Sequence, residues 1–398
     1  MDNIVAFLIV ASVYYIGEFV GAKTKAWVPS VFVTAALFLI GYWTFFPEDI
    51  VVLAGLGPPL GGLLVILLCI THMGTVISIK QLLGQWKVIV ITLAGLAGMI
   101  ILCWFVAMPL AGREYVISGL PPLTGGIVAA TIMNEAALEK GLTSAAVLAI
   151  AMYAVQGFVG YPLTSIMLKK EGKKLLESHS KEEIAATLTQ DKGKEASEGD
   201  SKKAPKKKLI PAIPAKYSTP ALILAKLMLV AWVANKLGAF TGLNQAVWAL
   251  ILGIVFTEIG FLDKDSLNKA KSYGFLMFIL MVYIFSGLKD ATPEILGAAI
   301  GPMAIIIVLG VTGMAIMSII AGKFFGVSWN MAFAVSLTSL YGFPPNAVIT
   351  EEVCNAMANT PEEKEFLMGK MLPMMLVGGF VSVTITSVII AGVFANLL

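Results

Sequence analysis

The sequence has few charged residues. Asp, Glu, Lys and Arg make up 13% of its 398 residues, whereas a soluble globular domain has about 25%. Apolar residues make up 58%, and apolar runs of transmembrane length recur along most of the chain. The composition therefore excludes an ordinary soluble domain. It predicts an all-α polytopic membrane protein of the bacterial cytoplasmic (inner) membrane.

The residues on which hydrolases and metal sites depend are also scarce. The sequence has two histidines and contains neither a Gly-x-Ser-x-Gly nor a His-Glu-x-x-His motif. Its three cysteines (Cys69, Cys103 and Cys354) lie in or beside apolar segments, as packing residues do. We therefore expect no enzyme, no disulfide framework and no organic or metal cofactor.

The sequence also lacks the basic N-terminal region and the small-residue cleavage site of a removable signal peptide. We therefore expect the first apolar run to be retained as a transmembrane helix. Ten apolar spans are predicted near residues 3–21, 28–46, 52–79, 88–110, 143–168, 218–237, 243–261, 273–288, 296–322 and 368–396. A polar segment, 169–217, follows the fifth span. It carries thirteen lysines and eight acidic residues and has no apolar face, which predicts a solvated linker between two membrane repeats, 1–168 and 218–398.

The lysines predict an orientation. Cytoplasmic loops carry an excess of Lys and Arg, which places the linker in the cytoplasm and, with five spans per half, both termini outside. Then 23 of the 28 basic residues lie inside, and without the linker the excess is still ten against four. The count requires 121–139 and 328–358 to enter and leave on one side, as re-entrant hairpins. A broken crossing helix is the alternative.

The two halves resemble each other in sequence. AVQGFVGYPLTSIML (154–168) aligns without gaps with LVGGFVSVTITSVII (376–390), with six of fifteen positions shared. Upstream, 73–84 aligns with 286–297 through two glycines. Five spans per half means that the second repeat crosses the membrane in the opposite direction. Inverted repeats with paired broken segments are typical of secondary transporters, which bind their solute near the middle of the membrane.

The stretch ATIMNEAALEKG (130–141) predicts the tip of the first hairpin. Ten residues from Pro122 to Thr131 would cover about 15 Å of helix, half of a hydrocarbon core of about 30 Å, so the tip is expected at 132–135. Asn134 would then cap the returning helix. Glu135 would be a charged group near the membrane centre, where such groups usually have a function.

The second hairpin is expected to turn at YGFPPNAVITEE (341–352). Two prolines cannot continue a helix, Gly342 allows a sharp bend, and Asn346 can cap the returning helix. Two half-helix N-termini would then attract an anionic group, while the carbonyl ends of the incoming limbs can coordinate Na⁺. The predicted binding residues are Thr131, Asn134, Glu135, Thr338, Ser339, Tyr341, Gly342 and Asn346, with Na⁺ near Asn134, Glu135 and Ser339.

This layout resembles the bacterial sodium–glutamate symporters (the glutamate:Na⁺ symporter family). The resemblance covers nearly the whole chain and is most specific in 260–303 and around Gly342 and Phe343. It implies two inverted repeats of five transmembrane helices, each with a hairpin before its last span. The family tends to carry Gly-Gly-x-Gly-type hairpin tips, whereas the tips expected here read Met-Asn-Glu-Ala (133–136) and Gly-Phe-Pro-Pro (342–345).

Two functions lead. One is Na⁺-coupled or H⁺-coupled symport of a small anionic solute, such as glutamate, another amino acid or a carboxylate, by alternating access. The other is a monovalent cation/proton antiporter with Asn134 and Glu135 as its ion site. A passive channel does not explain two inverted hairpins. The partners we expect are the solute, Na⁺, the lipid bilayer and a second copy of the chain in a homodimer, with no nucleic acid.

Overall fold

The computed structural model describes residues 1–76, 84–179, 210, 213–241 and 245–398, and these contain helices and no β-strand. Seven helices in this part are long and apolar enough to cross a membrane: Asn3–Lys23, Trp86–Ala111, Thr143–Glu177, Pro220–Thr241, Tyr273–Asp290, Ala299–Phe325 and Pro361–Ala395. Three shorter apolar helices are Ser30–Thr44, Leu60–Val76 and Gln245–Glu258. The prediction of an all-α polytopic membrane protein is confirmed.

The helices of the first half are α1 (Asn3–Lys23), α2 (Ser30–Thr44), α3 (Ile50–Leu53), η1 (Leu60–Leu64), α4 (Val65–Val76), α6 (Trp86–Leu102), η2 (Cys103–Ala107), α7 (Met108–Ala111), α8 (Arg113–Thr124), α9 (Ile127–Glu139) and α10 (Thr143–Glu177). The second half contains η3 (Ala215–Tyr217), α12 (Pro220–Thr241), α13 (Gln245–Glu258), α14 (Ser266–Lys269), α15 (Tyr273–Phe285), η4 (Ser286–Asp290), α16 (Pro293–Phe325), α17 (Trp329–Leu337), η5 (Thr338–Leu340), α18 (Pro345–Met357), α19 (Pro361–Phe380), η6 (Val381–Thr386) and α20 (Ser387–Ala395). The segments η1, η2 and η6 are π-helical, and the other η segments are 3₁₀ turns.

Short polar residues mark where several of these helices begin. The Asp2 carboxylate accepts a hydrogen bond from the Ile4 amide at the start of α1. The Ser328 hydroxyl caps α17 in the same way, and the Thr360 hydroxyl caps α19 just before a proline. Such side chains satisfy amide groups that have no partner in the first turn of a helix.

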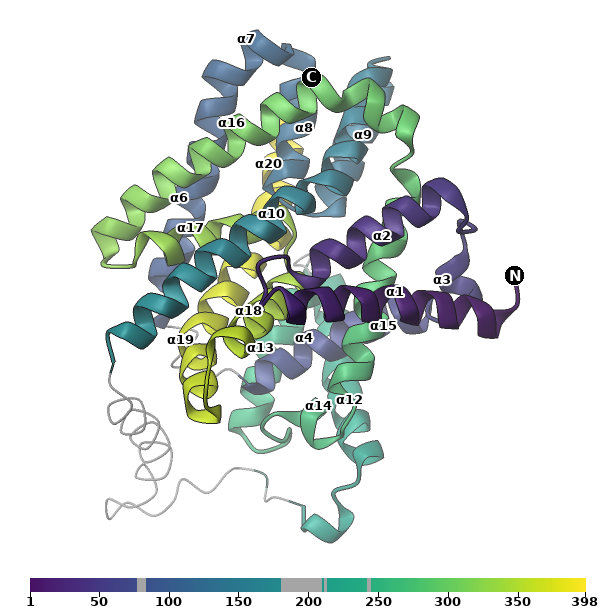
Figure 1. Ribbon diagram of the computed structural model, residues 1–398, viewed down its shortest axis with the longest axis vertical. Helices are drawn as coiled ribbons and strands as arrows, with labels where there is room; N and C mark the ends of the chain where they lie inside the picture. Colours follow the sequence, from purple (N-terminus) through teal and green to yellow (C-terminus); the bar gives the residue numbers. More distant parts are fainter. Residues whose placement is uncertain (77–83, 180–209, 211–212, 242–244) are drawn as a thin grey trace.

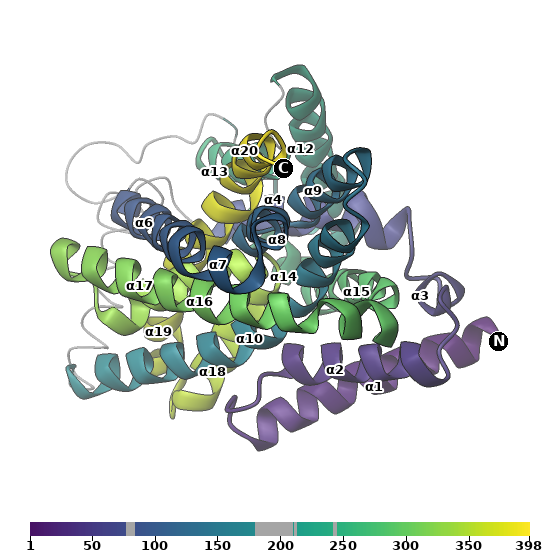
Figure 2. The ribbon, with the colours of Figure 1, turned by 90° about the horizontal axis from the view of Figure 1, so that it is seen from above.

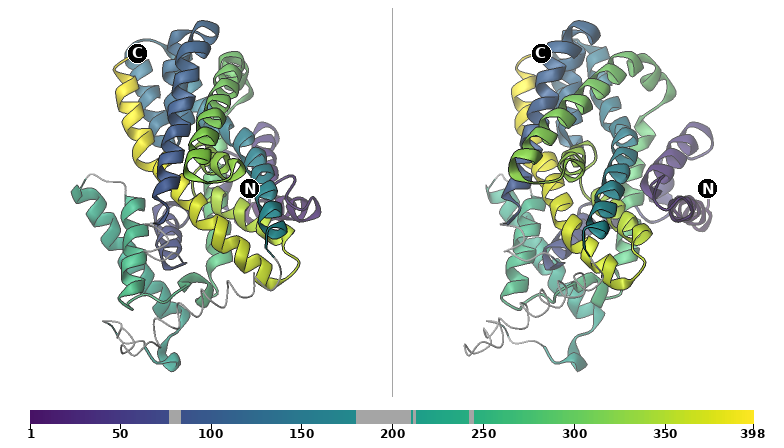
Figure 3. Two further views of the ribbon diagram at one scale, coloured as in Figure 1. Left: turned by 90° about the vertical axis from the view of Figure 1, so that its left-hand side faces the viewer. Right: turned by 60° about the vertical axis from the view of Figure 1, so that its left-hand side comes forward.

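The helices form two groups, which we call the outer group and the hairpin group. In the outer group (α1–α4 and α12–α15), α1 packs on α2, and α13 packs on both α12 and α4. In the hairpin group (α6–α10 and α16–α20), α6 packs along α16. Figure 1 shows α6–α9, α16 and α20 in the upper part of the molecule and α12–α15 in the lower part. The pairs α1–α2 and α12–α13 lie on opposite sides, as Figures 2 and 3 show.

Two broken helix pairs lie inside the hairpin group. The first hairpin is α8 with α9, and the second hairpin is α17 and η5 with α18. Helix α10 contacts both hairpins, and so does the continuous helix formed by α19, η6 and α20. The first hairpin packs between α10 and α20, and the second hairpin packs between α10 and α19.

Two predicted boundaries need correction. Helix α10 continues to Glu177, so the segment expected to be a linker from residue 169 begins inside a helix. The first hairpin begins at Arg113 rather than at 121. Most of the predicted linker (180–209 and 211–212) lies outside the described residues. So do the last three residues of the third predicted span (77–79).

Candidate functional site

The tip of the first hairpin is a pair of glycines. Helix α8 ends at Thr124 and α9 begins at Ile127, with Gly125 and Gly126 between them at φ +131° and +86°. These backbone conformations are open to glycine and rarely to other residues. The chain therefore reverses at Gly125 and Gly126, not at 132–135 as the sequence predicted.

The two hairpin tips meet on one residue of a third helix. A Cβ atom placed on Gly125 would lie 2.9 Å from Val383 Cγ2 and 3.0 Å from the carbonyl oxygen of Ser339 in the second hairpin. A Cβ atom on Gly342 would lie 3.0 Å from the same Val383 Cγ2. Val383 belongs to η6, the π-helical segment between α19 and α20. Three interruptions of regular helix thus come together at one point.

The second tip lies where the sequence predicted it. Helix α17 ends at Leu337 and the 3₁₀ turn η5 at Leu340, Gly342 has φ +67°, and α18 begins at Pro345. Tyr341 packs against α10, where its hydroxyl donates to Thr164 Oγ1 at 2.6 Å. On the same face of α10, a Cβ atom on Gly160 would lie 2.7 Å from the Tyr341 ring. Helix α10 therefore forms one wall of the second tip.

Buried oxygen atoms in the second hairpin and on α10 have no hydrogen-bond partner among the described residues. They include Ser339 Oγ and Asn346 Oδ1 in the second hairpin and Gln156 Oε1 on α10. Ser339 and Asn346 are 0% exposed and Gln156 is 2% exposed. Leaving a buried polar group unpaired costs about 1–3 kcal/mol. Orphaned oxygens at a helix break therefore suit a bound solute, cation or water.

Five of the predicted binding residues lie together in the second hairpin: Thr338, Ser339, Tyr341, Gly342 and Asn346. Thr338, Ser339 and Asn346 are fully buried. The Thr338 hydroxyl donates to the carbonyl oxygen of Val335 at 2.5 Å. The predicted cap role of Asn346 is wrong, because α18 has no side-chain cap. The amide of Asn346 instead donates to the Met375 carbonyl at 3.0 Å and joins α18 to α19.

The other three predicted residues lie along α9, away from the tips. Asn134 is seven residues past the start of α9, about 10 Å along the helix axis, so it does not cap that helix. Its amide donates to the Ala146 carbonyl of α10 at 3.0 Å. Thr131 and Glu135 are exposed. The first tip therefore contains glycines where the prediction put an Asn-Glu pair.

Sequence reasoning missed three residues of this site, Gly125, Gly126 and Val383, and the buried Gln156 on α10. The two adjacent glycines could have predicted the tip, because they come shortly after two prolines and a glycine pair favours a turn. Gln156 was detectable as a lone amide in an apolar span. Val383 carried no signal, since a valine in an apolar helix is ordinary.

The described residues contain no group of three or more His, Cys, Asp or Glu side chains placed to hold a metal ion. One carboxylate links the two helix groups at a distance from the tips. Glu352 of α18 accepts hydrogen bonds from the Ser30 amide and from the Ser30 hydroxyl, each at 3.0 Å. Ser30 is the first residue of α2, so this carboxylate sits at a helix N-terminus, which favours negative charge.

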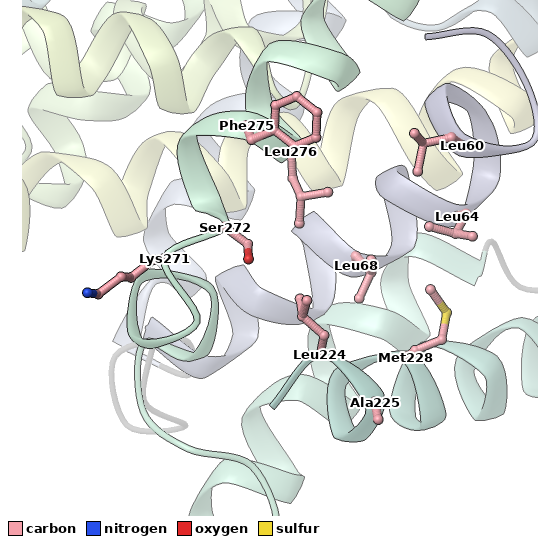
Figure 4. Close-up of a pocket in the computed structure, with 10 residues that line it drawn as sticks. All are labelled: Leu60, Leu64, Leu68, Leu224, Ala225, Met228, Lys271, Ser272, Phe275 and Leu276. Atoms are coloured by element: carbon pink, nitrogen blue, oxygen red, sulfur yellow. The ribbon is translucent and has the colours of Figure 1, made fainter. Parts of the chain in front are cut away.

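A pocket of about 510 Å³ lies in the outer group, away from the tips, between η1, α4, α12 and α15. Its lining is mainly apolar, with leucines from α4 and α12 facing each other in Figure 4 and Ser272 and Lys271 at one side. Lys271 lies at its edge and points away from the leucines. These walls do not suit a small polar solute. No model of a known protein family and no curated protein sequence matches this chain.

Proposed function

We propose that the protein is a secondary active transporter that moves a small anionic solute by alternating access, driven by Na⁺ or H⁺. One observation carries the proposal: the broken hairpins of the two halves meet at the π-helical break around Val383. The second hairpin there has buried oxygens with no hydrogen-bond partner in the described part of the chain. Irregular backbone inside a membrane bundle is tolerated where protein or a water-filled cavity encloses it. Secondary transporters bind solute and ion at such breaks.

The helix lengths support two repeats. Helices α1 and α12 have 21 and 22 residues, and α2 and α13 have 15 and 14. The last long helices of the two halves, Thr143–Glu177 and Pro361–Ala395, each have 35. Each of these two helices also contacts both hairpins. An internal duplication accounts for all of these pairs.

The crossing of α6 and α16 supports a two-fold relation between the repeats. GLAGMIILC (95–103) and GVTGMAIMS (310–318) share four of nine positions. A Cβ atom on Gly98 would lie 2.3 Å from the carbonyl oxygen of Gly313, and one on Gly313 would lie 2.3 Å from that of Gly98. Equal reciprocal contacts are what a two-fold axis between the helices produces.

The neighbours of this crossing follow the same relation. On α6, a Cβ atom at Gly95 would lie 2.7 Å from Ser336 Oγ in the second hairpin. On α16, a Cβ atom at Gly310 would lie 2.8 Å from Leu123 Cδ2 in the first hairpin. Each of the two helices therefore contacts the hairpin of the other half, which supports inverted repeats that enclose one site.

The chemistry of the tips favours an anion and a small cation. Helix α9 begins at Ile127, and Gly126 before it provides no side-chain cap, so amide groups and the positive end of the helix dipole face the tips. The carbonyl oxygen of Ser339 lies beside Gly125, and such carbonyls and hydroxyls are the ligands that Na⁺ takes at broken helices. The glycine pair also fits the glycine-rich tips of the sodium–glutamate symporters, the family that we propose for this chain.

The antiporter alternative has no comparable support. It needs Asn134 and Glu135 as an ion site, but the Asn134 amide is bonded to α10 and Glu135 is exposed. We therefore retain symport. We also retain the orientation with the linker in the cytoplasm and both termini outside, because it rests on the lysine count.

A binding measurement tests this proposal. Thermal unfolding of the purified protein is followed with a panel of amino acids and dicarboxylates, each with and without Na⁺ and at two pH values. A ligand at 100 times its Kd stabilises the folded state by about 2.7 kcal/mol. We expect one class of anions to raise the unfolding temperature and Ser339→Ala to abolish the shift. No shift with any anion, or an unchanged shift in Ser339→Ala, would contradict the site.

A transport measurement tests the coupling. In proteoliposomes, uptake of the stabilising solute should require an inward Na⁺ or H⁺ gradient and should stop when the gradient is dissipated. Equilibration of the solute without any gradient would instead favour a channel or facilitator.

A further inference from the structure

Lys169 and Lys170 are neighbours near the end of α10, and Lys169 contacts Lys25 of the α1–α2 connection. The ammonium group of Lys169 donates to the backbone carbonyl of Lys25 at 2.7 Å and lies 4.1 Å from the centre of the Trp27 ring. The next residue, Lys170, has its ammonium group 5.3 Å from the centre of the Trp329 ring. These five residues, which we call the lysine–tryptophan cluster, come from the α1–α2 connection, the end of α10 and the start of α17.

The cluster carries positive charge that the protein does not neutralise. None of its three lysines forms an ion pair with a carboxylate anywhere in the described part of the chain. The nearest acidic residues along α10 have other partners. Glu171 is buried and accepts a hydrogen bond from the Ser328 hydroxyl, and Glu177 pairs with Lys173 at 3.7 Å. An external anion is therefore the natural partner of these ammonium groups.

The tryptophans indicate where this anion is found. Trp27 is 59% exposed and Trp329 is 47% exposed. Trp27 lies in the short connection between two apolar helices, and Trp329 is the first residue of α17. Exposed indole rings in such positions mark the boundary between hydrocarbon and water. The lysines are thus held at the level of lipid headgroups. A phosphate that is anchored there by acyl chains reaches them at a far higher local concentration than a free ion.

We propose that the lysine–tryptophan cluster binds the phosphate headgroup of an anionic phospholipid. The ammonium groups of the three lysines donate to the phosphate oxygens, and the two indole rings cover the glycerol region. Because the cluster joins the α1–α2 connection to α10 and α17, the bound lipid links the outer group to the hairpin group. Basic pockets between transmembrane helices on the cytoplasmic side bind such headgroups in general.

The test compares lipids on the intact protein in a neutral detergent. Thermal unfolding is followed during titration with phosphatidylglycerol, phosphatidylcholine or inorganic phosphate. We expect phosphatidylglycerol to stabilise the protein and the other two to have little effect. The triple variant Lys25→Gln, Lys169→Gln, Lys170→Gln should need roughly tenfold to 100-fold more phosphatidylglycerol for the same stabilisation. Equal stabilisation by inorganic phosphate would overturn the lipid assignment.

A matched control replaces three lysines outside the cluster: Lys140→Gln, Lys236→Gln and Lys289→Gln. It removes the same net charge and should keep the phosphatidylglycerol response. If it loses the response equally, the effect is one of net charge and the cluster is not a site.

A smaller variant covers the case in which the triple variant does not fold. Lys25→Gln with Lys170→Gln keeps the bond from the Lys169 ammonium group to the backbone of residue 25. This variant should still need several-fold more phosphatidylglycerol, and an unchanged titration would refute the proposal. Neither result depends on transport, so failure of the lipid proposal would not contradict the proposed function, and the reverse also holds.

Discussion

Replacing Gly125 with alanine should damage the site more than any ordinary glycine substitution. The backbone at Gly125 has φ +131°, a conformation that costs a residue with a side chain about 1–3 kcal/mol. The added Cβ atom would also lie 3.0 Å from both the Ser339 carbonyl oxygen and Val383 Cα. These are backbone atoms that cannot rotate away, so overpacking adds about 1–3 kcal/mol. We expect a total loss of about 2–6 kcal/mol.

Two other glycines separate these contributions. Gly141 has φ +74° with nothing within 4 Å of its Cβ position, so Gly141→Ala carries the backbone strain alone. Gly392 lies within α20 and also has nothing within 4 Å. Gly392→Ala should therefore be neutral or stabilising by about 0.5–1 kcal/mol.

The assay is thermal unfolding of the three purified variants, together with the shift produced by the transported solute. We expect stability in the order Gly392→Ala, Gly141→Ala, Gly125→Ala, with the solute response lost in Gly125→Ala alone. If Gly125→Ala is no less stable than Gly141→Ala, the hairpin tips do not meet on Val383 and the reasoning about the site fails.

Three further predictions address other contacts. Gly98→Ala and Gly313→Ala should destabilise the protein by similar amounts, about 1–3 kcal/mol each, and a large difference in their unfolding temperatures would contradict a two-fold crossing. A double-mutant cycle of Glu352→Gln and Ser30→Ala should give a coupling of about 1–2 kcal/mol in unfolding free energy, whereas additive effects would mean that the bond contributes nothing. Glu135→Gln should leave the solute-induced shift and its pH dependence unchanged. Loss of either would restore Asn134–Glu135 as the ion site.

Much of the fold follows from the sequence because membrane helices are local structures. In hydrocarbon every backbone amide must bond within its own segment, so an apolar run of sufficient length is a helix whatever its neighbours are. The break at 341–345 was equally local, since consecutive prolines and a glycine cannot continue a helix. Both features can therefore be predicted from the residues of a short sequence segment.

The contents of the site depended on tertiary contacts. The predicted first tip lies too far along the chain, because a limb counted from Pro122 reaches the membrane centre later than a helix that begins at Arg113. Gly125 owes its role to Val383 and Ser339, which lie far away in the sequence. Asparagine is a common N-cap residue, yet the side-chain amides of Asn134 and Asn346 each donate to a backbone carbonyl of the next long helix. The hydrogen-bond partner of each side chain depends on how the helices pack against one another. Many apolar helix faces have similar composition, so the sequence does not specify which residues come into contact. The helices and the second tip thus follow from local sequence, whereas the meeting of both tips at a break in a third helix follows from tertiary packing.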